Sequence, residues 1–224
     1  MRRTPHLSCQ EHLVKFNRKK NAVAPSLAGD AAETPVAATE PARPRDSAQV
    51  DIDGDGVARV DLGGLLLAPV EGLEVRMQVE ESTGEVQAVV YAGADGALEV
   101  RAFAARRGGA MWDEIRPQVA ADAARKGGTA TAVPGPWGDE LLCQFTAPMP
   151  DGTPGRQESR IVGIDGDRWF VRGTLIGAPA VDDTARAPYD AALASLVVRR
   201  GAGAMAPGEA LPLVVPASAR RLDT

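Results

Sequence analysis

The sequence predicts a single α+β domain, built mainly from a twisted antiparallel sheet with two principal helices packed on it. Several segments alternate apolar and polar residues with a period of two, which is typical of strands with one buried face. Two other segments repeat their apolar residues at helical spacing. The connections are short and suit antiparallel neighbours, so we expect about six to seven strands rather than a doubly wound parallel sheet.

The first half of the domain predicts an antiparallel meander. In LEVRMQVE, which begins at Leu73, Val75 and Met77 point to the buried side while the charged residues point away. A turn at Gly84 leads into EVQAVVYA, and Asp95-Gly96 turns the chain again into ALEVRAFAA. These three segments predict about three consecutive strands.

The first predicted helix covers WDEIRPQVAADAARKGG and ends at Gly127. Trp112, Ile115 and Val119 fall on one face of it. If Asp113 is the cap, Pro117 lies in the first turn, where a missing N–H has no intrahelical partner to lose.

The second half predicts further strands and a second helix. The strands are TATAV, ELLCQFTAP, RQESRIVGID and DRWFVRGTLIG, the last two joined as a hairpin through Gly166. The helix is expected to start at Pro188, to place Leu193 on its apolar side and to stop at Gly201. The residues assigned to the structural core are Trp112, Trp169, Val75, Met77 and Leu193.

Composition predicts where the domain begins and ends. Residues 1–55 are expected to form a disordered tail, basic at Lys15–Lys20 and then rich in Ala and Pro. Residues 56–216 are expected to form the globular domain, with an extended C-terminal arm from about residue 202 and a disordered end at 217–224. We also hypothesise that translation starts at Val14, which would make residues 1–13 a mis-called start.

The histidine, cysteine and apolar content of the chain disfavours several classes of function. The only histidines are His6 and His12, both in the expected tail, so catalytic triads, Cys-His pairs and zinc hydrolase sites are not predicted. Cys9 and Cys143 do not form a disulfide framework, which agrees with a reducing compartment. The sequence has no long apolar run and no secretory signal, so a cytoplasmic location without a membrane span is expected.

Candidate motifs for metals and cofactors are weak. DIDGDG at Asp51 begins like a calcium-binding EF-hand loop, but its twelfth position is Leu62 where a bidentate Glu is required. Cys143 sits in an apolar strand pattern, and Asp113 with Glu114 suits a helix start. No phosphate loop or dinucleotide fingerprint is present, so we expect no cofactor and no metal.

The residues proposed for binding lie on the polar side of the predicted sheet. Alternation gathers arginines and aromatic rings there, a composition enriched at protein interfaces. The candidates are Arg76, Arg101, Phe103, Phe170 and Arg172. The alternative is that these arginines only pair with Glu74, Glu80 and Glu99 on a solvated face, or that a helix covers the face.

A resemblance to a known family rests on four segments, RVDLGGLLLAPVEGLEVRMQVEESTGEVQAVV, MWDEIR, DRWFVRGTLIG and MAPGEALPLVVP. Together they resemble an actinobacterial family of uncharacterised cytosolic proteins known only as a domain of unknown function, over about residues 58–216. The resemblance implies no activity and no site residues. The order of elements is also similar to that of PsbP-like α/β/α sandwiches.

Three functions are compatible with these observations. The absence of recognisable catalytic motifs favours a non-enzymatic binding or adaptor protein with a protein partner. An alternative is a histidine-independent enzyme that acts on a small anionic or phosphorylated metabolite, which needs convergent carboxylates in a pocket. A third possibility is contact with RNA through the basic tail. It is the weaker alternative because the net charge of −5 gives no strong nucleic-acid signal.

Overall fold

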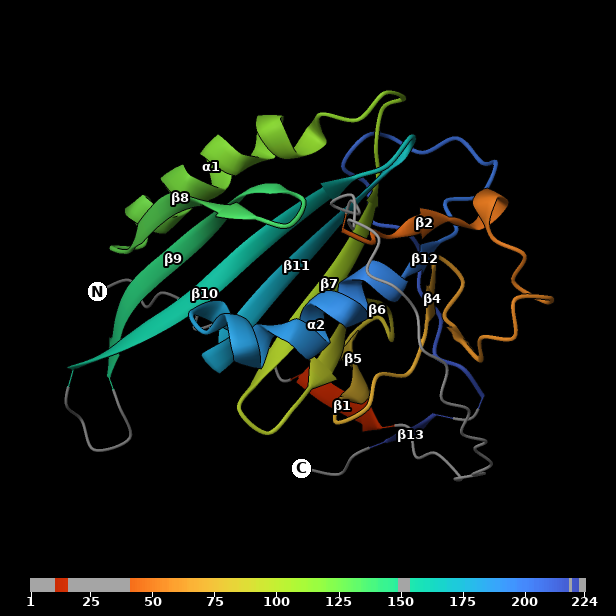
Figure 1. Ribbon diagram of the computed structural model, residues 1–224, viewed down its shortest axis with the longest axis horizontal. Helices are drawn as coiled ribbons and strands as arrows, with labels where there is room; N and C mark the ends of the chain where they lie inside the picture. The colour runs from red at the N-terminus through yellow and green to blue at the C-terminus, as the bar shows by residue number, and fades with distance from the viewer. Residues whose placement is uncertain (1–10, 16–40, 149–153, 218, 222–224) are drawn as a thin grey trace, which may run out of the picture.

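The computed structural model describes residues 11–15, 41–148, 154–217 and 219–221. It confirms an α+β fold with two principal helices and a mainly antiparallel sheet (Figure 1). The large sheet has the strand order β13-β1-β5-β6-β7-β11-β10-β9-β8, and all its pairings are antiparallel. Its strands are β1 (Glu11–Lys15), β5 (Glu74–Glu80), β6 (Val86–Ala92), β7 (Gly96–Ala104), β8 (Thr129–Gly135), β9 (Gly138–Pro148), β10 (Pro154–Asp165), β11 (Trp169–Gly177) and β13 (Arg220–Arg221).

A smaller second sheet was not predicted from the sequence. Its order is β2-β12-β4-β3, and its strands are β2 (Arg45–Asp46), β3 (Val60–Asp61), β4 (Leu65–Leu67) and β12 (Val197–Val198). β12 runs parallel to β2 and antiparallel to β4. The helices are α1 (Met111–Arg125) and α2 (Asp183–Ser195), with short 3-10 turns η1 (Ser47–Gln49) and η2 (Ala178–Ala180).

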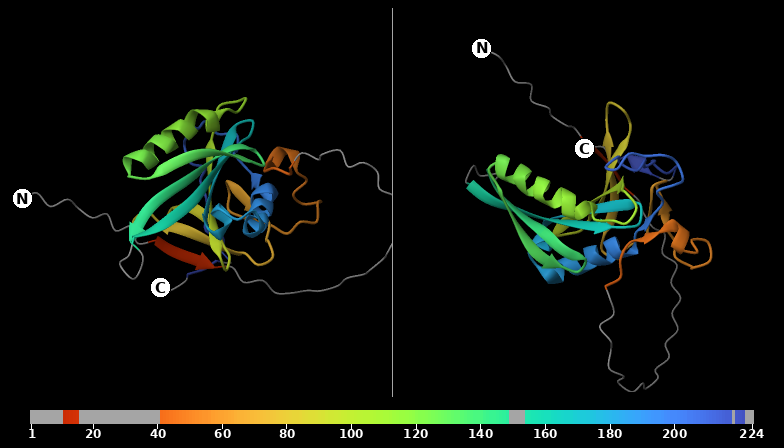
Figure 2. Two further views of the ribbon diagram at one scale, coloured as in Figure 1. Left: turned by 60° about the vertical axis from the view of Figure 1, so that its left-hand side comes forward. Right: turned by 90° about the horizontal axis from the view of Figure 1, so that it is seen from above.

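The two helices lie on opposite faces of the large sheet (Figure 2). α2 and the small sheet cover the face on which the main core lies, which includes Met77, Val100 and Val171 of the sheet and Leu193 of α2. α1 packs on the other face against β8, β9 and β10, over a smaller core that contains Trp112 and Phe170. The large sheet is therefore covered on one face by α2 and the small sheet, and on the other by α1 at the β8–β10 end.

Alternation along the strands determines which side chains enter the main core. Burial in β7 follows a period of two, with Leu98, Val100, Ala102 and Ala104 buried and the residues between them only partly buried. In β5, Val75 and Met77 are buried, as are Trp169 of β11, Trp112 of α1 and Leu193 of α2. Trp169 shares its face with Val171 and Leu175 in the same cluster.

α1 is capped by a residue distant in sequence. Ala110 is the N-cap, with φ of 71°, and the expectation of a cap at Asp113 is wrong. The carboxylate of Asp165, at the end of β10, instead accepts hydrogen bonds from the backbone N–H groups of Met111 (2.9 Å) and Trp112 (3.2 Å). Pro117 consequently lies inside α1 and not in its first turn.

Gly163 permits the close approach of α1 to the sheet. A Cβ atom at Gly163 would lie 2.2 Å from Cδ2 of Trp112, far inside van der Waals contact. The Trp112 indole also donates a hydrogen bond of 2.6 Å to the carbonyl of Asp139. The indole ring therefore rests directly on the backbone of β10.

α2 begins and ends earlier than the sequence predicted. Asp182 is the N-cap and its side chain accepts from Thr184 N and Ala185 N, so Pro188 lies inside the helix instead of at its start. The helix ends at Ser195, and the expected stop at Gly201 is wrong. Val197 and Val198 are completely buried as β12, because their apolar side chains fill the core when they pair with β4 in the small sheet.

The folded part of the chain extends further toward the N-terminus than residue 56. Asp46 accepts a hydrogen bond of 3.1 Å from Trp169 Nε1, and the carbonyl of Ala42 accepts one of 3.0 Å from Trp137 Nε1. Residues 11–15 pair with β5 as β1, which differs from the tail expected there and includes residues of the hypothesised mis-called start. The expectations for residues 1–10 and 16–40 lie outside the described residues.

The C-terminal arm continues the sheet beside β7. The paired part of β6 ends opposite Val100, and beyond it the arm takes the vacated edge of β7. Leu211 N donates to Ala102 O at 2.9 Å, and Ala104 N donates to Glu209 O at 2.8 Å. Farther along, Gly63 forms an isolated bridge with Leu213. The arm thus closes one edge of the main core.

Replacing Trp169 with Ala tests the assignment of the main core. The change removes a side chain that is 3% exposed and leaves Asp46 without its indole donor, so we expect a loss of roughly 3–5 kcal/mol in the free energy of unfolding. Val181→Ala, at a position 53% exposed, is the control and should change stability by less than about 0.5 kcal/mol. Equal urea midpoints for the two variants would contradict the assignment.

Candidate functional site

The polar face of the sheet over β5, β6, β7 and β11 is the candidate functional site. We call it the arginine face, and its residues are Arg76, Val90, Glu99, Arg101, Phe103, Arg172 and Thr174. They point away from the main core, because the residues next to them in each strand are the buried ones. α1 covers the same side of the sheet at β8, β9 and β10 (Figure 1), so the arginine face lies beside the helix.

Strand register places two arginines directly opposite each other. Arg101 of β7 is the antiparallel partner of Arg172 of β11, and Phe103 is the partner of Phe170 two residues further along. Directly opposed like charges on neighbouring strands are destabilising. The pairing of β7 with β11 therefore concentrates positive charge at the centre of the face.

Neighbouring hydrogen-bond acceptors and carboxylates compensate only part of this positive charge. Arg101 donates to Gln87, through Nε to the backbone carbonyl at 2.9 Å and through Nη2 to the side-chain oxygen at 3.2 Å. Arg172 lies 3.9 Å from the carboxylate of Glu99, longer than a hydrogen bond, and its guanidinium stacks over the Phe103 ring at 5.8 Å. Burial, followed by repulsion from Arg101, lowers the pKa of Arg172.

Arg76 forms the other end of the face. Its Nη2 donates to Glu74 at 3.0 Å, and its side chain is 33% exposed. The Nε atoms of Arg76 and Arg172 are both buried without a hydrogen-bond partner among the described residues. Each guanidinium therefore keeps unused donor capacity.

Phe170 is separated from the other proposed binding residues. Its side chain is 1% exposed and lies between Phe103, at 6.0 Å between ring centroids, and Trp112 of α1, at 6.2 Å. A partner cannot reach it without moving α1. The structure thus brings Arg101, Phe103 and Arg172 together, places Arg76 two strands away on the same face, and assigns Phe170 to the core beneath α1.

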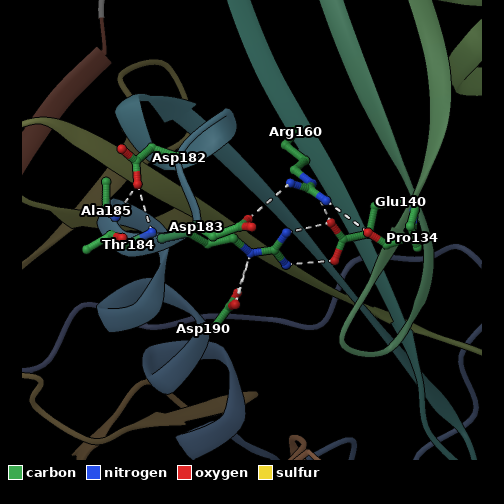
Figure 3. A network of polar contacts seen from close by, with 9 residues as sticks. Pro134, Glu140, Arg160, Asp182, Asp183, Thr184, Ala185 and Asp190 are labelled. Atoms are coloured by element: carbon green, nitrogen blue, oxygen red, sulfur yellow. Dashed lines mark hydrogen bonds and ion pairs between the residues drawn. The ribbon is translucent and has the colours of Figure 1, made fainter.

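A second polar group, the charge cluster, lies on the opposite face and consists of Glu140, Arg160, Arg186 and Asp190. Arg186 of α2 is 3% exposed and makes two hydrogen bonds of 2.7 Å to the carboxylate of Glu140 on β9. Its Nε donates to both oxygens of Asp190 at 2.9 Å. Figure 3 shows Glu140 also facing Arg160 of β10, whose Nε donates to it at 2.7 Å.

The charge cluster fixes α2 to the sheet. Arg160 adds a hydrogen bond of 3.0 Å to the carbonyl of Pro134 and lies 3.8 Å from Asp183 (Figure 3). Burial lowers the pKa of Arg186, but its hydrogen bonds to Glu140 and Asp190 outweigh burial and raise it. Burial raises the pKa of Asp190. The hydrogen-bonding groups of Glu140 and Arg186 are occupied by each other and by Arg160 and Asp190. We therefore assign the charge cluster a structural role.

Sequence reasoning missed the charge cluster, although one signal was present. Arg186 occupies the helical stripe that continues through Tyr189 and Leu193, both of which are buried. A charged residue on the apolar side of a helix requires a buried counter-charge. The sequence alone did not identify Glu140 as that partner, because β9 lies far away along the chain.

The residues considered for metal binding or nucleophilic chemistry are buried or take part in local hydrogen bonds and ion pairs. Among the described residues, no group of three or more His, Cys, Asp or Glu side chains gathers to hold a metal ion. Asp51 accepts from Gly54 N at 3.1 Å within its own turn, and Asp55 pairs with Arg59 at 2.6 Å. Cys143 is buried, and burial raises the pKa of its thiol. Neither helix of the described chain is long and apolar enough to cross a membrane.

Removing one partner of the charge cluster tests its structural role. Arg186→Met leaves the Glu140 carboxylate buried without its main counter-charge, so we expect a loss of about 3–5 kcal/mol in urea unfolding. The matched control is Arg106→Met, since Arg106 pairs with Glu114 at 3.3 Å on the surface and should contribute about 0–1 kcal/mol.

The double variant Glu140→Gln/Arg186→Met gives a second check. Its loss in the free energy of unfolding should be smaller than the sum of the losses in the two single variants. Each single variant leaves one buried charge without its partner, whereas the double variant removes both charges. Strictly additive losses would show that the two side chains are not coupled.

Comparison with known proteins gives one match. A family model described as a protein of unknown function (DUF3710) matches residues 44–221. The comparisons with curated proteins and with solved structures found no match. The matched range includes the arginine face, the charge cluster and the C-terminal arm.

Proposed function

The chain belongs to the DUF3710 family, and we propose that it is a non-enzymatic binding domain that holds a protein partner on the arginine face. The proposal rests on one observation, the pairing of Arg101 with Arg172 beside Phe103 on a face that α1 leaves uncovered. Arginine and aromatic side chains supply much of the binding energy at protein interfaces. The cytoplasmic location, the actinobacterial origin and the PsbP-like arrangement expected from the sequence remain predictions.

The geometry supports binding better than a purely structural use of these arginines. Glu74 and Glu99 pair with Arg76 and Arg172, as the alternative interpretation expects. These contacts leave the Nε atoms of both arginines unsatisfied, and an unsatisfied buried donor has a free-energy cost of about 1–3 kcal/mol. A partner recovers that cost only if these side chains move on binding, because both Nε atoms are removed from solvent.

The shape of the site also favours a protein partner. Small-molecule sites are usually concave and enclose most of their ligand. The arginine face consists of outward-pointing side chains of four strands, with Arg76 and Arg172 33% and 28% exposed. Ile176 of β11, on the same side of the sheet, is 38% exposed and adds apolar surface. An extended surface of this kind suits a polypeptide.

The test compares two triple variants of equal charge. The face variant replaces Arg76, Arg101 and Arg172 with Gln. The control variant replaces Arg106, Arg125 and Arg156 with Gln, which changes the net charge by the same amount at side chains 70%, 77% and 64% exposed. We expect a partner that co-purifies in stoichiometric amount with the native and control proteins to be absent from the face variant.

The melting temperature of the face variant should remain within about 5 °C of the native value, because partly exposed ion pairs contribute little to folding. Retention of the same partner by the face variant would refute the proposal. If the face variant unfolds, single Arg101→Gln and Arg172→Gln variants provide the same comparison, and undiminished capture by both would equally refute it.

A further inference from the structure

The charges at the centre of the arginine face do not balance. Within the described residues, two guanidinium groups, Arg101 and Arg172, share this centre with one carboxylate, Glu99, which reaches Arg172 only at 3.9 Å. The other carboxylates of this side of β5 have partners of their own. Glu74 accepts from Arg76 at 3.0 Å, and Glu80, at the end of the strand, accepts from Ser82 at 3.1 Å. The excess positive charge therefore lies at the Arg101–Arg172 pair.

We propose that the partner presents an acidic segment to this face, with one carboxylate held between Arg101 and Arg172. The inference rests on the proposed function and specifies the chemistry of the partner. Arg101 and Arg172 are direct neighbours across two strands, and the present partner of Arg101 is the neutral Gln87. A planar guanidinium binds a carboxylate through two parallel hydrogen bonds, and a shared carboxylate would also remove the repulsion within the pair.

The burial of Arg172 favours the same position for the carboxylate. Its Nε atom is removed from water without gaining a partner among the described residues. Burial and then the proximity of Arg101 lower the pKa of Arg172, and the opposing effect of Glu99 at 3.9 Å does not outweigh them. Electrostatic attraction is stronger at a partly desolvated site than in bulk water. A carboxylate that binds at this position would therefore gain more binding free energy than a carboxylate at an exposed arginine such as Arg125.

The spacing of the arginines indicates how the acidic residues are distributed. Arg76 on β5 and Arg101 on β7 are separated by β6 and offset by two residues along the strands, so they lie about 12 Å apart at the usual strand spacing and rise. Val90 of β6 is directly opposite Arg76 on one side and Glu99 on the other. The matching segment therefore has two carboxylates about 12 Å apart, one for each of these arginines.

A phosphate-rich partner such as nucleic acid fits this surface less well. Glu74 and Glu99 are interspersed among the arginines and would repel a continuous row of phosphates. The whole chain also has a formal net charge of −5. A polypeptide can place individual carboxylates at the arginines and leave neutral residues opposite the glutamates.

Selection from a random dodecapeptide library displayed on phage tests the inference directly. The full-length protein is immobilised, and parallel selections use the Arg101→Gln/Arg172→Gln variant and the Arg106→Gln/Arg125→Gln control. We expect peptides enriched in Asp and Glu from the native protein and the control. The selected peptides should bind the Arg101→Gln/Arg172→Gln variant at least about tenfold more weakly, which corresponds to about 1.4 kcal/mol.

The outcomes separate the inference from the proposed function. Peptides that depend on Arg101 and Arg172 but show no enrichment in Asp and Glu would overturn the acidic segment and leave the arginine face as the binding site. Peptides that bind the Arg101→Gln/Arg172→Gln variant as well as the native protein, or a selection that yields no binder, would overturn both. An Arg101→Lys/Arg172→Lys variant should retain part of the affinity, since it keeps the charge but loses the bidentate geometry.

Discussion

The antiparallel pairing of β7 with β11 is the constraint on which the rest of the structure depends. The two strands stay in register from Ala97–Ile176 to Ala104–Trp169, at the centre of the large sheet. Because side chains alternate between faces, this single register sends Val100, Val171 and Leu175 into the main core. A slip of one residue would exchange the two faces and place charged side chains under α2.

The same register creates the features of the opposite face. It places Arg101 opposite Arg172 and Phe103 opposite Phe170, so that one aromatic ring is buried beneath α1 while the other stays at the border of the exposed surface. α1 is held at this position by the Asp165 cap and by the Trp112 ring resting over Gly163. The arginine face is thus the part of the sheet that begins where the helix stops.

On the core side, the charge cluster has a different role from the arginines of the exposed face. Arg186 and Glu140 satisfy each other at 2.7 Å with almost no exposure, and such a pair is sensitive to loss of either partner. Arg172 has a carboxylate only at 3.9 Å and an unsatisfied Nε. The contrast between a saturated buried arginine and an unsaturated half-buried one is the basis for assigning structure to the first and binding to the second.

Local patterns made the strands and the side of the sheet on which the arginines lie predictable. The alternation in LEVRMQVE and DRWFVRG is a property of neighbouring residues, and the strands it describes are present as β5 and β11. The Asp165 cap, the Glu140–Arg186 pair and the conversion of Val197–Val198 into a strand depend on residues far apart in sequence. Periodicity contains no information on such contacts, so helix ends and the charge cluster were missed.

The most direct measurement of the central claim is an NMR titration of the arginine Nε–H groups with a peptide or partner selected on the native protein. We expect the Nε–H resonance of Arg172 to shift on binding, because a carboxylate at its guanidinium group changes the electrostatic surroundings of this buried donor. The Arg101 resonance should shift as the same carboxylate approaches, whereas those of Arg106, Arg125 and Arg156 should not move. Shifts confined to these three surface arginines, with Arg101 and Arg172 unchanged, would contradict the assignment of binding to the arginine face.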